Sequence, residues 1–371
     1  MKKNLTGFTL HELAEIIKTA GFPAYRAEQV FRYLHFHTIE DIGSMNIVPV
    51  NIREFLNSNF KITPLKTITV TESGVDNTRK FLFEAVEGGK PVKIETVLIS
   101  ENERLTVCVS TQAGCNVGCD FCATGRMKLL RNLTPGEIVS QVYGVSRLAQ
   151  GKITNLVFMG MGEPLLNYDN VIKALLILTD KKGFAVSSGK ITISTVGFKD
   201  RIKKLADDIT SPENSTLRRL KLALSLHTTD KGLREKIIPV SKIHSLSGIY
   251  EELIYFYRKT GTKITYEYIH FEGINDTPND VKRLTKLSGM IPSNINIIPF
   301  HPVDFELSGP LNNLNKKIHT NIFDGSENSL SKNKLNDFIT ELRENKVIVN
   351  LRTSSGVDIN AACGQLAVIN R

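Results

Sequence analysis

Three of the five cysteines in this 371-residue chain lie within one short segment. Cys115, Cys119 and Cys122 are separated by three and then by two residues in the stretch GCNVGCDFCATG, and no fourth cysteine continues the pattern. Thiolates are preferred ligands of soft metals, so a compact group of cysteines in a chain otherwise sparing of sulfur indicates a metal centre.

Two kinds of metal centre fit three clustered cysteines. A structural zinc site can use three cysteines and one histidine, but its ligands normally come as two separated pairs. A single compact loop is better suited to a 4Fe-4S cluster, which ordinarily takes four cysteines. Three cysteines leave one iron open, and an open iron can chelate a small molecule through an amine and a carboxylate. We therefore expect a cluster with a vacant coordination site, with zinc as the alternative.

The remaining two cysteines lie in contrasting surroundings. Cys108 is part of the apolar segment LTVCVST, where a cysteine is ordinarily a small buried hydrophobic residue. Cys363 stands between Ala362 and Gly364, which leave its sulfur unobstructed, in a tail with little apolar periodicity. The sequence thus indicates an accessible thiol near the C-terminus.

The elements that must position these residues are short apolar strands that alternate with helices. Seven such strands follow one another: LTVCVST, NLVFMGM, KITISTV, KLALSLH, KITYEYIHF, NINIIPF and KVIVNLRT. This alternation is typical of an α/β fold with parallel strands, and it predicts an open, partial (β/α)6 barrel of the TIM type. Chemistry in such barrels occurs in the loops after the strands. The cysteine loop, the turn at 160–164, Ser194, the segment 225–227 and His301 all fall at or just past strand ends.

Four regions are predicted along the chain. Residues 1–62 form a small helical accessory domain, because 10–21 and 25–36 carry apolar residues at helical spacing. Residues 63–100 alternate as strands do and form a β connector. Residues 101–353 form the core barrel, and residues 354–371 form a C-terminal loop that carries Cys363.

Aromatic and basic residues gather in the second predicted helix. These residues suit either RNA binding or an amphipathic helix packed on the barrel, and the sequence leaves both interpretations open. The residues are Tyr25, Arg26, Phe31, Arg32 and Tyr33.

Charge and composition favour a polyanionic partner. The 47 Lys and Arg residues outnumber the 38 Asp and Glu residues and give a formal charge of +9, which favours phosphate contacts. An odd number of cysteines argues against a secreted disulfide framework. No apolar run reaches membrane-spanning length, so we expect a cytoplasmic protein without a membrane partner.

Five segments together resemble one family. The segments VKIETV, CVSTQAGCNVGCDFCATG, RNLTPGEI, NLVFMGMGEPLLNYDNV and DINAACGQLA are similar to the RlmN/Cfr family of radical S-adenosylmethionine (SAM) RNA methyltransferases, and most similar to its RlmN branch. The resemblance implies a 4Fe-4S cluster on Cys115, Cys119 and Cys122 and a fold built around a radical SAM core. It also implies SAM contacts at Gly162, Glu163, Ser194, Ser225, Leu226 and His227.

The same resemblance implies a route for the reaction. Cys363 would carry a methyl group as a covalent intermediate, Cys108 would form a transient disulfide with it, and Glu95 would accept a proton. The expected product is an adenosine methylated on carbon 2 in 23S rRNA, with transfer RNA as a second candidate substrate. Carbon 8 methylation and a non-RNA substrate remain alternatives. An external donor such as flavodoxin or ferredoxin would supply electrons.

This chain departs from the family pattern at three positions. His301 stands where relatives usually have an asparagine that touches SAM, so it is left out of the expected contacts. Asn360 replaces a usual aspartate, and Ser355 replaces a basic residue. The last two lie near the expected methyl-carrying loop and bear on the substrate more than on the chemistry.

Overall fold

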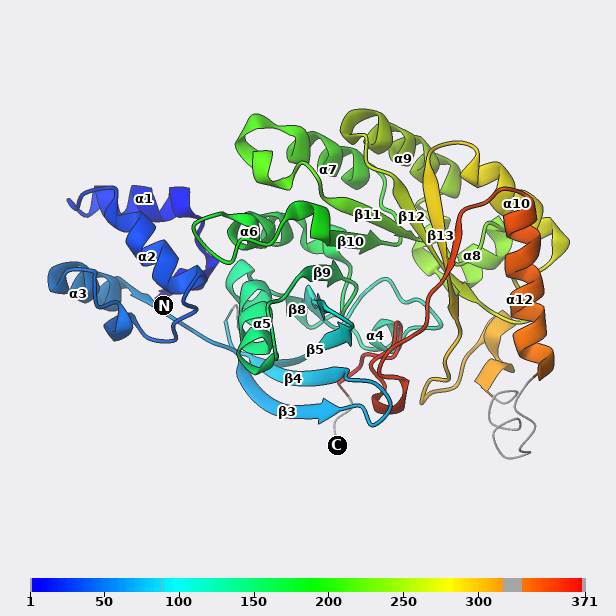
Figure 1. Ribbon diagram of the computed structural model, residues 1–371, viewed down its shortest axis with the longest axis horizontal. Helices are drawn as coiled ribbons and strands as arrows, with labels where there is room; N and C mark the ends of the chain where they lie inside the picture. Colours follow the sequence, from blue (N-terminus) through cyan, green and yellow to red (C-terminus); the bar gives the residue numbers. More distant parts are fainter. Residues whose placement is uncertain (1, 88, 316–328, 369–371) are drawn as a thin grey trace.

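The centre of the molecule is one curved ten-stranded sheet (Figure 1). The computed structural model describes residues 2–87, 89–315 and 329–368. The strand order is β14-β13-β12-β11-β10-β9-β6-β5-β4-β3, and neighbours from β6 to β14 are parallel. The parallel strands are β6 (Arg104–Cys108), β9 (Asn155–Phe158), β10 (Ile191–Thr195), β11 (Lys221–Ser225), β12 (Ile264–His270), β13 (Ser293–Pro299) and β14 (Val349–Leu351).

Helices cover the outer side of the parallel strands (Figure 1). They are α5 (Pro135–Leu148), α6 (Tyr168–Thr179), α7 (Arg201–Thr210), α8 (Lys231–Ile237), α9 (Leu246–Thr260), α10 (Pro278–Ser288) and α12 (Ser329–Glu344). The partial barrel predicted from the strand–helix alternation is confirmed, and β14 adds a seventh parallel strand to it. Two of these helices, α5 and α10, begin with capping boxes, which Thr134 forms with Glu137 and Thr277 forms with Asp280.

The predicted β connector continues the same sheet. The strands β3 (Lys66–Glu72), β4 (Arg79–Ala85) and β5 (Val92–Glu101) pair antiparallel with one another, and β5 pairs antiparallel with β6. Strand β5 runs through the predicted boundary at residue 100, and residues 369–371 of the predicted tail lie outside the described residues. The domain boundaries therefore stay a prediction.

The N-terminal region is helical and packs on the barrel. Its elements are β1 (Lys3–Asn4), η1 (Leu5–Gly7), α1 (Leu10–Thr19), α2 (Arg26–His35), η2 (Ile42–Ser44), α3 (Val50–Asn59) and β2 (Phe60–Lys61). Helix α2 is amphipathic: Phe31 is fully buried, and Nδ1 of His35 lies 2.7 Å from the Tyr143 hydroxyl of α5. Tyr25 is 60% exposed, so Phe31 belongs to the packing face and Tyr25 to the surface. None of the described helices is long and apolar enough to cross a bilayer.

One buried side chain fastens α5 to the sheet just before the cysteine loop. The Gln141 amide oxygen accepts hydrogen bonds from the Ser110 N–H and the Thr96 hydroxyl, each at 2.8 Å. Its Nε2 donates to the Ser110 carbonyl at 2.8 Å. Gln141 thus replaces the strand partners that Ser110 lacks beyond the end of β6, and it fixes where the chain leaves the sheet.

We expect Gln141→Leu to lower the free energy of unfolding by about 2–4 kcal/mol, because the buried N–H and carbonyl of Ser110 lose their partners. Chemical denaturation of the cluster-free protein, followed by circular dichroism, measures this loss. The exposed Gln150 provides a matched control, Gln150→Leu, which should change stability by less than about 0.5 kcal/mol. Equal stability of the two variants would contradict the assignment.

Candidate functional site

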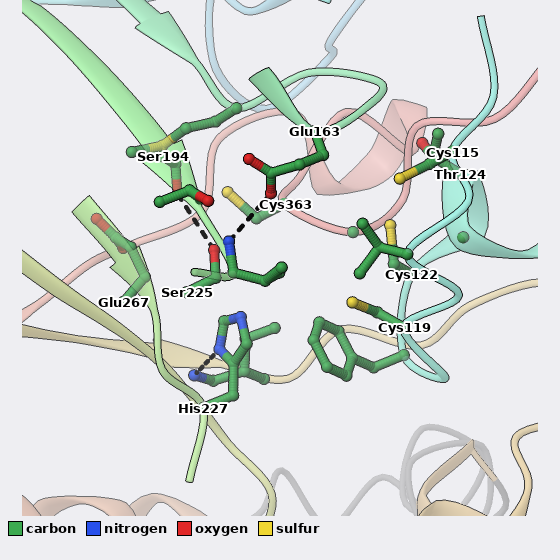
Figure 2. Close-up of a pocket in the computed structure, with 18 of the residues that line it drawn as sticks. Cys115, Cys119, Cys122, Thr124, Glu163, Ser194, Ser225, His227, Glu267 and Cys363 are labelled. Atoms are coloured by element: carbon green, nitrogen blue, oxygen red, sulfur yellow. Dashed lines mark hydrogen bonds between the residues drawn. The ribbon is translucent and has the colours of Figure 1, made fainter. Parts of the chain in front are cut away.

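A single pocket at the carboxyl ends of the parallel strands collects most of the predicted site residues (Figure 2). Its empty space, open solvent included, is about 820 Å³. The predicted residues that line it are Cys115, Cys119, Cys122, Gly162, Glu163, Ser194, Ser225, His227 and Cys363. Leu226, Cys108 and Glu95 do not line it.

The cysteine loop is folded tightly so that its sulfur atoms turn toward the pocket (Figure 2). Its backbone closes where the Cys122 N–H donates to the Cys119 carbonyl at 3.2 Å. A side chain at Gly125 would come within 2.8 Å of the Cys119 carbonyl oxygen, so only glycine fits there. Phe121 lies edge-on to the His227 ring, with centroids 4.7 Å apart, and closes the loop on the barrel side.

The chemistry of the three thiols fits an iron–sulfur cluster. Burial raises the pKa of Cys115 to about 12 and raises the pKa of Cys119 and of Cys122. Three buried thiols side by side cannot all ionise without a compensating positive charge. A cluster of iron ions would supply this charge, and the three sulfur atoms on one loop would hold three of its irons.

The turn after β9 brings backbone groups close to the pocket. Gly162 has φ +97°, and a side chain there would approach Gln112 Cβ within 2.5 Å. Glu163 follows it and accepts N–H bonds from Leu165 at 3.0 Å and Val196 at 3.1 Å. Burial raises the Glu163 pKa to about 7. The turn therefore offers a fixed carboxylate and unobstructed backbone to a ligand.

Polar groups on β10 and β11 face the same pocket. The hydroxyls of Ser194 and Ser225 lie 3.2 Å apart. Nδ1 of His227 accepts the Ile269 N–H at 3.1 Å, so the neutral ring carries its hydrogen on Nε2. Burial, aided by the charge of Arg234, lowers the His227 pKa to about 3. His227 is thus a neutral donor, and the two serines can donate or accept.

Leu226 contributes differently from its neighbours. Its side chain is fully buried in the core, while its N–H donates to the Glu267 carbonyl at 2.9 Å. The guanidinium of the buried Arg234 donates to the carbonyls of Leu226, Ser225 and Val196. Arg234 therefore holds the chain of two neighbouring strand ends in place around the pocket.

The C-terminal tail lies directly against the cysteine loop. The Ala123 N–H donates to the Gly364 carbonyl at 2.7 Å, and the Thr124 hydroxyl donates to the Leu366 carbonyl at 2.5 Å. These bonds bring Cys363 into the pocket with the three loop cysteines (Figure 2). The structure thus unites four cysteines from two distant parts of the chain.

Cys108 and Glu95 lie on the sheet beside the tail. Cys108 pairs with Val97 across β5 and β6, so Cys108, Val97 and Glu95 share one face of the sheet. Burial, together with nearby Cys363, raises the Cys108 pKa to about 12. Oε2 of Glu95 accepts the Ala367 N–H at 3.0 Å. All five cysteines are free thiols.

Two charged residues of the pocket escaped the sequence prediction. Glu267 on β12 and Arg352 just after β14 line it, with Arg352 Nη1 3.5 Å from Glu267 Oε2. Glu267 stands within the apolar segment KITYEYIHF, and Arg352 stands within KVIVNLRT. A charged residue inside such an apolar segment is the sequence signal that could have identified both. His301 is not among the lining residues.

Comparison with known proteins gives consistent matches. Residues 109–284 match the model of the radical SAM superfamily, and residues 3–62 match that of the ribosomal RNA large subunit methyltransferase N-terminal domain. A protein of Salinibacter ruber described as a probable dual-specificity RNA methyltransferase RlmN is 40% identical, over 96% of this chain and 91% of its own length. A likewise described protein of Flavobacterium psychrophilum is 37% identical, over 99% of this chain and 98% of its own.

A solved structure shows the same arrangement. The crystal structure of a radical SAM methyltransferase from Sphaerobacter thermophilus superposes with a TM-score of 0.84 at 34% identity. The match covers 98% of this chain and 99% of the other. The similarity therefore extends through the accessory region, the barrel and the tail.

Anaerobic reconstitution with iron and sulfide should give a brown protein that absorbs in the visible and holds about four irons per chain. Cys119→Ala should lose most of this absorbance, because one corner of the cluster loses its ligand. Cys108→Ala is the matched control and should keep it, since this thiol lies outside the loop. A colourless protein that instead retained one zinc ion would contradict the cluster assignment.

Proposed function

Because this chain belongs to the RlmN family of radical SAM RNA methyltransferases, we propose that it methylates carbon 2 of an adenosine in 23S rRNA through a methyl group carried on Cys363. As a radical SAM enzyme it uses a 4Fe-4S cluster and SAM, as the sequence predicted. The observation that carries the proposal is the position of Cys363, held in the pocket beside the cysteine loop.

Carbon 2 of adenine demands unusual chemistry. This carbon is electron-poor, so it cannot displace a methyl group from a sulfonium, whereas a carbon radical can add to it. A cluster held by Cys115, Cys119 and Cys122 would supply the electron that reductive cleavage of SAM requires. The chain itself must bind SAM, hold the methyl group and handle the protons.

The proposed residue roles follow one methyl group from SAM to RNA. The Cys363 thiolate takes the group from a first SAM by nucleophilic displacement. The 5′-deoxyadenosyl radical from a second SAM takes a hydrogen atom from the S-methyl group and becomes 5′-deoxyadenosine. The carbon radical left on the sulfur then bonds to the ring. The adduct would return one electron to the bound cluster, and its ring proton passes to Glu95. Cys108 then attacks the Cys363 sulfur, the methylene leaves with the base and gains a proton, and a disulfide remains.

The geometry of the described residues supports these roles. Gly162 and Glu163 present a backbone turn and a carboxylate for the methionine amine of SAM, and Ser194, Ser225 and His227 present donors for its carboxylate and ribose. Leu226 takes part through its backbone, because its side chain is buried in the core. Cys108 and Glu95 share a sheet face beside the tail, where both can act on the Cys363 adduct.

The target base must leave its stack to reach the pocket, so the substrate is an extruded or single-stranded adenosine. Tyr25 is exposed on the accessory region, and the Arg26 guanidinium lies 4.8 Å from its ring centroid, an arrangement suited to stacking on RNA. Transfer RNA is a second candidate substrate, and a flavodoxin or ferredoxin is the candidate electron donor. Ribosomal RNA as substrate places the enzyme in the cytoplasm.

We expect Cys363→Ala to abolish RNA methylation while the cluster remains and SAM still binds, because the methyl carrier is lost. Cys108→Ala should still acquire a methyl group on Cys363 but should lose at least about 100-fold in product, since no thiolate attacks the Cys363 sulfur to release the methylene with the base. Peptide mass spectrometry and a tritium-transfer assay measure both. Full RNA methylation by Cys363→Ala would refute the covalent route and favour a different substrate.

Mass spectrometry of nucleosides from cells with and without the gene should show 2-methyladenosine in 23S rRNA only when the gene is present. This base and carbon follow from the proposal. If 8-methyladenosine disappears instead, the enzyme is a carbon 8 methyltransferase. The transfer RNA fraction of the same cells shows whether it is a second substrate.

A further inference from the structure

Lys80 lies beside Glu95 and has no role in the chemistry above. It stands on β4 opposite Val97 of β5, and Val97 stands opposite Cys108 of β6. Cross-strand partners share a sheet face, so Lys80 lies on the same face as Cys108 and Glu95. Its Nζ is 3.1 Å from Glu95 Oε1, and both side chains are largely buried. This is a close ion pair in a poorly solvated place.

The two partners of this ion pair also hold the tail, one at each side of Cys363. Lys80 Nζ donates to the Asn360 carbonyl at 3.2 Å, three residues before Cys363. Oε2 of Glu95 accepts the Ala367 N–H at 3.0 Å, four residues after it. The loop 360–367 is therefore attached at both ends to one ion pair.

The tail has a separate anchor upstream of this loop. Asp358 accepts hydrogen bonds from the Ser73 hydroxyl at 2.7 Å and the Gly74 N–H at 2.8 Å, in the turn between β3 and β4. This anchor does not involve Lys80 or Glu95. The middle of the loop is held separately, because the Ala123 N–H and the Thr124 hydroxyl donate to the Gly364 and Leu366 carbonyls. Loss of the ion pair would therefore loosen the two ends of the loop without detaching the tail.

We propose that the Lys80–Glu95 ion pair clamps both ends of the loop that carries Cys363, and that arrival of the ring proton on Glu95 releases this clamp. The inference rests on the proposed role of Glu95 as proton acceptor. A proton moves from the ring carbon to a Glu95 oxygen, and the neutral carboxyl then attracts Lys80 and the Ala367 N–H less strongly. The two ends of the loop can then shift at the stage when Cys108 must reach the Cys363 sulfur.

Lys80 acts here as a positioning residue, since it works through Glu95 and the tail. Burial raises the Glu95 pKa, and the charge of Lys80 counteracts this rise. The groups that face the Glu95 carboxyl are Lys80 from β4 and the Ala367 N–H from the tail, while Met161 Sδ lies 3.3 Å from its backbone nitrogen. Lys80 is thus the cation that favours the ionised, clamped form.

Hydrogen exchange of the cluster-loaded enzyme with SAM and without RNA tests the clamp directly. Lys80→Met should raise exchange in the segment 360–367 by about tenfold, and Lys80→Arg should stay close to the wild type. Glu95→Gln imitates the protonated carboxyl and should also raise exchange there. Lys93→Met removes an exposed lysine of neighbouring β5 and serves as the matched control. Unchanged exchange in Lys80→Met would overturn the proposal.

A second readout separates positioning from general damage. Lys80→Met should still methylate Cys363 but should methylate RNA at least about tenfold more slowly, and Lys80→Arg should restore most of that rate. If Lys80→Met raises hydrogen exchange throughout the barrel, the Glu95→Gln variant tests the clamp instead. Faster exchange confined to 360–367 in Glu95→Gln supports the clamp, and unchanged exchange there overturns it. Failure of the proposed function would look different. Exchange in segment 360–367 would still be slower in the wild type than in Lys80→Met, but the wild type would not methylate RNA.

Discussion

The site depends on the contact between the C-terminal tail and the cysteine loop. Two hydrogen bonds, from the Ala123 N–H to Gly364 and from the Thr124 hydroxyl to Leu366, lay one segment on the other. Both acceptors are backbone carbonyls, so the contact depends on the path of the chain more than on side-chain identity. Gly364, with φ +85°, lets the tail turn there. Without this contact Cys363 would be an ordinary thiol near a chain end.

Burial gives the pocket its electrostatic character. It raises the Glu163 pKa to about 7 and lowers the His227 pKa to about 3, so both groups lose charge more readily than in water. Buried surroundings of this kind strengthen the field of any cation bound beside them, including a sulfonium. They also protect a carbon radical from side reactions. Lys80 and Glu95 form their ion pair in similarly buried surroundings beside the pocket.

The sequence predicted the parts whose signals are local. The parallel strands follow from short apolar runs, and the metal centre follows from the spacing of three cysteines. Each of these signals is contained within a few residues, where backbone preference and ligand geometry act directly. The family resemblance added Cys363 and Glu95, which residue type alone would leave unassigned.

The parts that escaped prediction depend on contacts between distant segments. Glu267 and Arg352 meet only because β12 and β14 flank β13, and a strand order is not written in any single strand. The pairing of Lys80 with Glu95 likewise requires the register of β4 on β5. The motif predicted Leu226 as a SAM contact, and the burial of its side chain in the core leaves its backbone for that role. Burial of this kind emerges only when the whole barrel is assembled.

The central claim is that the methyl group on Cys363 lies next to SAM in the pocket and gives up one of its hydrogens there. It is tested most directly by loading Cys363 with a CD₃ group, adding unlabelled SAM, RNA and reductant, and weighing the 5′-deoxyadenosine formed in one turnover. The account predicts 5′-deoxyadenosine that carries one deuterium and RNA that carries the remaining two. Unlabelled 5′-deoxyadenosine beside methylated RNA would contradict it.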